Sequence, residues 1–332
     1  MRITRAAVVE VGAWPHPERA ALLEGRGAVL AWDVLGDAAP AARVHDVDRA
    51  ADWLWEAYGD EAAAGVLGDA AGITPAGAWP AGRALAQLAW LEAWWPASGA
   101  AGVPALDLSV LRAERAVATS AVEHLLDDED ATGRALAAVP ADPVVAGLSD
   151  RLAALAEDYG VVLPAPVASR AEFALAAGGD AAGDGTGADG VTVHSGADPV
   201  DWALVPAGAV DAAADARWAV VRRGGATFLD VAVPGGPRPG VPLAARFGAV
   251  EVALDGTDGL GRRTGRTPVP ATVLLLPPAA RRLTVYAPGF APPAAPDRDP
   301  DAPSRRAAII AYARTRPDAP DATLTERLAG RR

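Results

Sequence analysis

Residues 178–190 read GGDAAGDGTGADG, and this stretch separates two halves of the chain that differ in their apolar pattern. Its Gly, Ala and Asp residues bring almost no apolar surface to bury, whereas ordering one residue costs roughly 1–2 kcal/mol of conformational entropy. We therefore predict a Gly/Asp linker over residues 177–190. Apolar residues recur at helical spacing before it and alternate with a period of two after it. The predicted fold class is α+β, in two domains.

The first predicted domain, residues 1–176, is mainly helical, acidic and rich in Trp. Helical spacing extends over residues 48–59, 80–95, 107–139 and 150–159. A small β element comes first, because alternation predicts strands over 4–11 and 28–35. Pro17 favours a short helix over 17–25 between these strands. Both a β-α-β unit and a hairpin-like arrangement therefore stay open.

The second predicted domain, residues 191–290, is an antiparallel β-sandwich or barrel. Short alternating segments separated by turn residues predict strands over 191–194, 216–223, 227–233, 243–247, 250–254, 271–276 and 283–286. Residues 259–265 predict a Gly/Arg hairpin loop. The remaining residues, 291–332, divide into a Pro-rich extended segment and an Arg-rich C-terminal helix.

The composition excludes several chemistries. The chain has 332 residues, enough for two domains with a sizeable core, but it has no Cys, and its 30 Lys or Arg residues are all Arg. Without Cys there is no thiolate nucleophile, disulfide or Cys-based metal centre. Without Lys there is no GxxxxGK phosphate loop, pyridoxal Schiff base or amine nucleophile. We predict no cofactor.

The charge of the chain bears on its partners. The net charge of the chain is −12. Residues 1–176 contain 12 Arg and 25 acidic residues, a net charge of −13, whereas residues 177–332 contain 18 Arg and 17 acidic residues, a net charge of +1. Binding phosphates needs a basic surface, so we expect neither duplex nucleic acid nor a membrane as a partner. The most apolar stretch, 84–106, is interrupted by Glu92 and two prolines, and Glu10 interrupts the apolar core that a signal peptide needs. We expect a cytoplasmic location.

The densest titratable cluster is EHLLDDED at residues 123–130. On a continuous helix, residues three and four apart share a face. The candidate catalytic residues are accordingly Glu123, His124, Asp127 and Asp128. Their carboxylates could hold Mg²⁺ or Ca²⁺, and the imidazole could carry a proton. The alternative is a solvated acidic face, and we assign no metal site here.

Aromatic and basic residues supply the candidate interaction residues. Eight of the 10 Trp lie before residue 100. Core packing explains buried Trp, but adjacent Trp on divergent helix faces favour a protein contact surface, where Trp and Arg are common anchors. The tail from residue 303 has seven Arg against three acidic residues and could dock on the acidic half of this chain or of a neighbour, or form a solvated helix. The candidates are Trp53, Trp55, Trp90, Trp94, Trp95, Arg305, Arg306, Arg314 and Arg316.

These observations predict a non-catalytic interaction or scaffold protein, or an accessory subunit of a multiprotein system. Its partner would be another protein or a second copy of the chain. The alternative is a metal-dependent enzyme or a small-molecule binder that uses the acidic cluster. A third hypothesis, a carbohydrate- or surface-binding β-module, depends on Trp202 and Trp218 alone.

Overall fold

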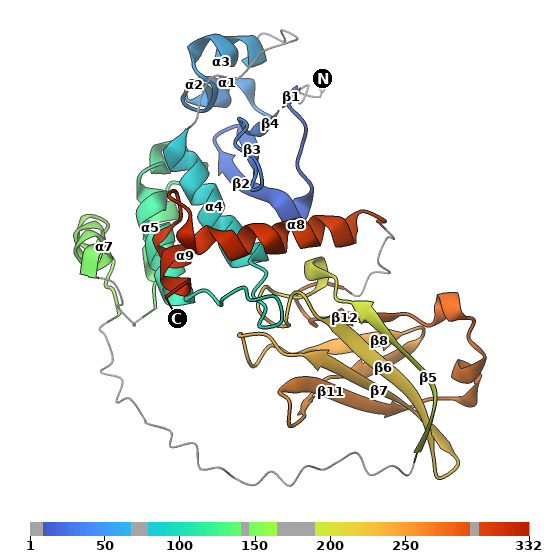
Figure 1. Cartoon of the computed structure of the whole chain (residues 1–332). Helices are drawn as coiled ribbons and strands as arrows, with labels where there is room; N and C mark the ends of the chain where they lie inside the picture. Colours follow the sequence, from blue (N-terminus) through green and yellow to red (C-terminus); the bar gives the residue numbers. More distant parts are fainter. Residues whose placement is uncertain (1–8, 68–78, 141–145, 165–189, 293–298, 332) are drawn as a thin grey trace, which may run out of the picture. The chain divides into compact units, whose positions relative to one another are not determined.

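The computed structural model describes residues 9–67, 79–140, 146–164, 190–292 and 299–331 (Figure 1). It contains both helices and antiparallel sheets, so the fold is mixed α+β, as predicted. The predicted linker over 177–190 lies outside the described residues except for Gly190. The chain divides into two compact units. Unit 1 comprises Met1–Ala93, Leu106–Ala168 and Thr315–Arg332, and unit 2 comprises Trp94–Ala105 and Ser169–Arg314.

Unit 1 contains a four-stranded antiparallel sheet with the order β1-β4-β3-β2. Its strands are β1 (Val9–Val11), β2 (Ala20–Gly25), β3 (Ala28–Asp33) and β4 (Ala41–Val44). β2 and β3 form a hairpin. The described part of the predicted strand over 4–11 is β1, and the predicted strand over 28–35 is β3; β4 lies between them in the sheet, so they form neither the β-α-β unit nor a hairpin with each other. β2 has a neighbour on one side only and is an edge strand of the sheet.

The predicted helix over 17–25 is wrong. Only Pro17–Arg19 forms a 3-10 turn (η1), and β2 follows it. Ala21 and Leu23 of β2 are buried whereas Leu22 and Glu24 are exposed, which is the alternation of a strand. The sequence hides this alternation because the exposed Leu22 is as apolar as its buried neighbour.

Helices make up the rest of unit 1. They are α1 (Val47–Ala51), α2 (Leu54–Tyr58), α3 (Asp60–Leu67), α4 (Pro80–Trp94), α5 (Leu108–Ser120), α6 (Ala131–Ala137), α7 (Ala146–Asp158) and α9 (Leu324–Ala329), with 3-10 turns η2 (Glu123–Leu125) and η6 (Arg316–Asp318). The predicted helix over 107–139 is therefore two helices. At the end of α5, the hydroxyls of Thr119 and Ser120 donate to the carbonyls of Arg115 (2.8 Å) and Val117 (2.9 Å). Such bonds compete with continued helix formation.

Unit 2 contains two antiparallel sheets, with the orders β10-β11-β7-β6-β5 and β12-β8-β9. Its elements are β5 (Gly190–Pro199), η3 (Trp202–Leu204), β6 (Asp215–Arg223), β7 (Ala226–Pro234), β8 (Ala244–Phe247), β9 (Val250–Ala253), β10 (Gly256–Thr257), β11 (Arg262–Pro268), η4 (Ala271–Leu275), η5 (Pro278–Ala280) and β12 (Leu283–Tyr286), followed by α8 (Ala302–Thr315). Both sheets are open, with free edge strands in the described residues. Leu229 and Val231 of β7 share one hydrophobic cluster with Phe247 of β8 and Val252 of β9, so the two sheets bury one core.

In unit 2, one prediction is wrong and another is correct only in part. The predicted strand over 271–276 is the 3-10 turn η4, which follows Pro270. The predicted hairpin loop over 259–265 is correct in its first part, because residues 258–261 connect the antiparallel strands β10 and β11, but residues 262–265 belong to β11, which pairs with β7 over its whole length. None of the helices in the described ranges combines the length and apolar character that crossing a lipid bilayer requires.

Candidate binding groove in unit 1

A groove of about 360 Å³ lies in unit 1 between the edge strand β2 and helices α4, α5 and α6. This volume is at the lower end of the range for small-ligand sites, roughly 300–1,000 Å³. Its apolar lining includes Leu22, Leu23, Leu85, Ala89, Leu126 and Ala135. Its charged lining consists of Glu24, Glu92, Arg112, Arg115, Asp128 and Arg134. The groove therefore offers an apolar floor together with both signs of charge.

Arg112 and Arg115 of α5, called here the arginine pair, share one carboxylate on α4. Arg112 Nε lies 3.3 Å from Glu92 Oε1, and Arg115 Nη1 lies 2.6 Å from Glu92 Oε2. The arginine side chains are 36% and 44% exposed, and that of Glu92 is 27% exposed. Two guanidinium groups against one carboxylate leave this corner of the groove with a net charge of +1.

Two contacts mark the limits of the free edge of β2. At its C-terminal end, Gly25 forms an isolated antiparallel bridge with Leu126, and Arg26 N donates to the Leu125 carbonyl at 2.8 Å. Just before its N-terminal end, Trp90 of α4 donates from Nε1 to the Glu18 carbonyl at 2.9 Å. Between these contacts, Leu22, Leu23 and Glu24 of β2 line the groove.

The structure separates the four candidate catalytic residues, because the helix on which they would share a face is interrupted. The Glu123 carboxylate accepts hydrogen bonds from Thr132 N (3.2 Å) and from Tyr159 Oη. The bond from Tyr159 is the main cause of the raised pKa of that tyrosine. Each of the other three has a different partner. The His124 imidazole lies 3.4 Å from the Glu56 carboxylate, Asp127 pairs with Arg49, and Asp128 pairs with Arg134. Asp128 alone lines the groove. In the ranges that the structure describes, no three His, Cys, Asp or Glu side chains are placed to hold a metal ion.

The five candidate Trp lie in different environments. Trp53, Trp90 and Trp95 are buried, and their indole N–H groups donate to the carbonyls of Arg26, Glu18 and Pro104. Trp94 is half-buried, and Trp55 is 48% exposed. Trp53, which precedes α2, is buried whereas Trp55 on α2 is exposed, and three of the five rings contribute to packing and are not on the surface.

The candidate Arg residues of the tail also separate. In unit 2, Arg305 pairs with Asp299 at 2.8 Å, and Arg306 donates to the Val200 carbonyl at 2.7 Å. Arg314 is exposed. Arg316 is 6% exposed and belongs to unit 1.

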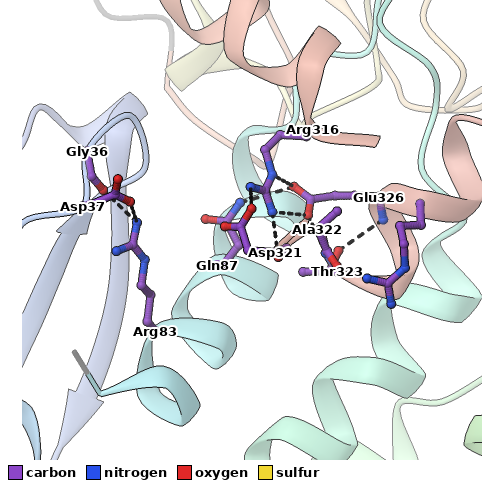
Figure 2. Close-up of polar contacts among 10 residues, drawn as sticks. Gly36, Asp37, Arg83, Gln87, Arg316, Asp321, Ala322, Thr323 and Glu326 are labelled. Carbon is purple, nitrogen blue, oxygen red and sulfur yellow. Dashed lines mark hydrogen bonds and ion pairs between the residues drawn. The ribbon is translucent and has the colours of Figure 1, made fainter. Parts of the chain in front are cut away.

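The buried Arg316 forms the centre of a polar cluster, which Figure 2 shows. Its Nε and Nη2 donate to the two carboxylate oxygens of Glu326, each at 2.8 Å, and its Nη1 donates to Asp321 at 2.9 Å. Glu326 is fully buried and also lies 3.5 Å from Gln87 Nε2 of α4. Both carboxylate oxygens of Glu114 on α5 accept from the first residues of α9, Leu324 N at 2.8 Å and Thr325 N at 2.9 Å. This cluster fastens residues 316–329 to α4 and α5.

The groove residues Arg112, Arg115 and Glu92 were missed by sequence reasoning. Arg112 and Arg115 are three residues apart in a predicted helix, a spacing that puts them on one face. The spacing of these two arginines could therefore have predicted a basic patch on this helix. Their shared partner comes from another helix, and single-sequence periodicity does not reveal such a pairing. Comparison of the chain with protein-family models, with curated proteins and with solved structures found no match.

Proposed function

We propose that this chain is a non-catalytic interaction protein, a scaffold or accessory subunit, whose unit 1 takes an extended segment of a protein partner into the groove beside β2. The observation that carries the proposal is the coincidence of a free sheet edge with an apolar groove. A peptide that adds to a sheet edge gains main-chain hydrogen bonds from the strand and specificity from pockets for alternate side chains. Residues 20–24 supply the edge, and the exposed Leu22 lies on the groove wall.

The antiparallel bridge between Gly25 and Leu126 supports this mode of binding. It indicates that the outer edge of β2 accepts an extended backbone, because residues 125–126 already occupy its last position. A partner segment would continue this pairing toward Ala20. The groove side chains suit binding more than catalysis: Glu92 and Asp128 are each paired with arginine, and the hydroxyl of Thr119 donates to the Arg115 carbonyl.

The wider architecture belongs to the same proposal. We take the two units as the two predicted domains and the two sheets of unit 2 as the layers of a β-sandwich, supported by the core to which both sheets contribute. In this proposal, the recognition of a partner segment belongs to unit 1. The exposed Trp55 is an additional contact residue for the same partner.

A groove-filling substitution tests the proposal. The immobilised full chain is incubated with a pool of hexapeptides that are randomised at five positions and end in Leu, half as free acids and half as amides. We expect capture, detected by mass spectrometry, and slower hydrogen exchange at the amides of Leu22 and Glu24. Ala135→Trp should abolish capture because Ala135 lines the groove, whereas Ala137→Trp, on the same helix but exposed outside it, should not. Failure of the wild-type chain to capture peptide, or equal capture by Ala135→Trp, contradicts the proposal.

A further inference from the structure

We propose that the arginine pair selects the free C-terminal carboxylate of a partner segment whose last side chain is apolar. This inference rests on the proposed function and specifies the ligand class of the same groove. A chain terminus of this kind carries a carboxylate and an apolar side chain on one residue. The groove places partners for both side by side.

The charge at Arg112 and Arg115 supports a carboxylate ligand. Each guanidinium has five N–H donors, and in the described part of the chain each makes one hydrogen bond to Glu92. A second carboxylate would bring the local charge from +1 to zero with Glu92 in place. Arginine is suited to this role because its planar donors match the two oxygens of a carboxylate.

The position of the arginine pair along β2 supports a chain end. Trp90 contacts Glu18, just before β2, so that Glu92 and its two arginines lie near the N-terminal end of this strand. A segment antiparallel to β2 would run from the Leu126 end toward the arginines, in the direction already taken by residues 125–126. A segment whose last residue reaches this end of β2 would therefore place its terminal carboxylate beside the arginine pair.

The apolar requirement follows from the spacing on α4. Ala89 and Leu85 precede Glu92 by three and seven residues, which places them on the same helix face, and both line the groove. A terminal residue with its carboxylate at the arginine pair would therefore direct its side chain onto Ala89 and Leu85. Leu, Val or Ile fits this surface, whereas a charged side chain would be desolvated there.

The test compares three forms of one peptide. The tightest hexapeptide captured from the Leu-ending pool is labelled with fluorescein at its N-terminus. Its affinity for the full chain is measured by fluorescence anisotropy as the free acid, as the amide, and as an amide whose last residue is Glu. We expect the free acid to bind at least tenfold more tightly than either amide. Arg112→Gln and Arg115→Gln should each reduce this preference to threefold or less, while Arg43→Gln, a control on β4 that is exposed and does not line the groove, should preserve it.

Each outcome decides the inference. Equal binding of the free acid and the Leu amide to the wild-type chain overturns carboxylate selection but leaves the proposed function standing. Binding of the Glu amide as tight as that of the free acid shows that a side-chain carboxylate is recognised and overturns selection of the chain end. Binding by none of the three forms overturns both proposals. Circular dichroism of the Gln variants verifies that they are folded.

Discussion

Arg316 and Glu326 form an ion pair in which both partners are buried and both carboxylate oxygens accept hydrogen bonds. Glu326 Oε2 also accepts from Thr323 N at 2.7 Å, in the capping box of α9. Removing two charges from water carries a desolvation cost that the pair offsets only while both members are present. Loss of one partner is therefore more damaging than the net contribution of the pair suggests.

Arg316→Met should lower the free energy of unfolding of unit 1 by about 3–5 kcal/mol, because the Glu326 carboxylate stays buried without its cation. Urea unfolding followed by Trp fluorescence measures the change. Arg314→Met is the matched control: this arginine, two residues away, is exposed, so its replacement should change stability by no more than about 0.5 kcal/mol. Equal effects of the two substitutions would show that the buried pair is not the cause.

The raised pKa of Tyr286 leads us to expect a loss of stability at alkaline pH. Burial, followed by the hydrogen bond to Glu251, raises the pKa of Tyr286 to about 12. The unfolded tyrosine titrates near 10, so the native state binds the proton more tightly. This contribution to stability is complete below about pH 10 and is lost as the pH rises to about 12.

Replacing the phenol tests that pH dependence. Tyr286→Phe removes the titrating group, so the fall in unfolding free energy between pH 10 and 12 should be smaller than in the wild-type chain by about 2 kcal/mol. Urea midpoints at three pH values across this window provide the measurement. Parallel curves for the two proteins would mean that Tyr286 ionises in the folded state as readily as in the unfolded chain.

At the scale of elements, β11 packs closely against the neighbouring sheet at Gly265. A Cβ built on Gly265 would lie 2.1 Å from the Ala253 carbonyl oxygen and 2.7 Å from a methyl group of Val252. Gly265→Ala should therefore destabilise unit 2 by about 1–3 kcal/mol through overpacking. Gly259→Ala is the control in the same segment, since nothing lies within 4 Å of its Cβ position. Chemical denaturation of both variants checks this, and a neutral Gly265→Ala would show that β9 and β11 can move apart.

The periodicity of apolar residues correctly predicted strands in which buried and exposed residues alternate. It did not predict strands that form because of pairing with neighbouring strands. In β7, Leu229, Val231 and Val233 are buried on one face, and the predicted strand is correct. β11 has no alternating apolar residues and is a strand because β7 and β10 pair with it on both sides. The segment that forms β2 was predicted incorrectly for a different reason: its exposed Leu22 is apolar, so the sequence does not show the alternation of buried and exposed residues.

The candidate site was less predictable than the fold. The acidic residues at 123–130 are conspicuous in the sequence, but they converge only if their helix is continuous, and it ends at Ser120. The groove depends on residues from four elements, so it exists only after those elements pack together. Its one local signal, the spacing of Arg112 and Arg115, gives the basic patch without the apolar floor.

At the scale of the whole molecule, the chain returns to unit 1 after completing unit 2. Residues 315–332 belong to unit 1, although some 150 residues separate them from its preceding segment, which ends at Ala168. Their contacts with Glu114 and Gln87 are therefore long-range, and they fasten the C-terminal segment to α5 and α4. These contacts join segments of unit 1 that are far apart in the sequence. We therefore expect the stability of unit 1 to depend on them more than the stability of unit 2 does.

Deletion of residues 315–332 tests this dependence. The deletion removes the Arg316–Glu326 pair and leaves the Glu114 carboxylate without the α9 amides it accepts from. Local opening of α5 should become easier, so its amides should exchange with deuterium at least tenfold faster, whereas those of β6 and β7 should keep their rates. Deletion of residues 331–332 alone should change neither, because the deleted part includes none of these contacts. Equal acceleration in α5 and in β7 would mean that the terminal segment stabilises the chain as a whole, and unchanged exchange in α5 would mean that its contacts with α4 and α5 contribute little.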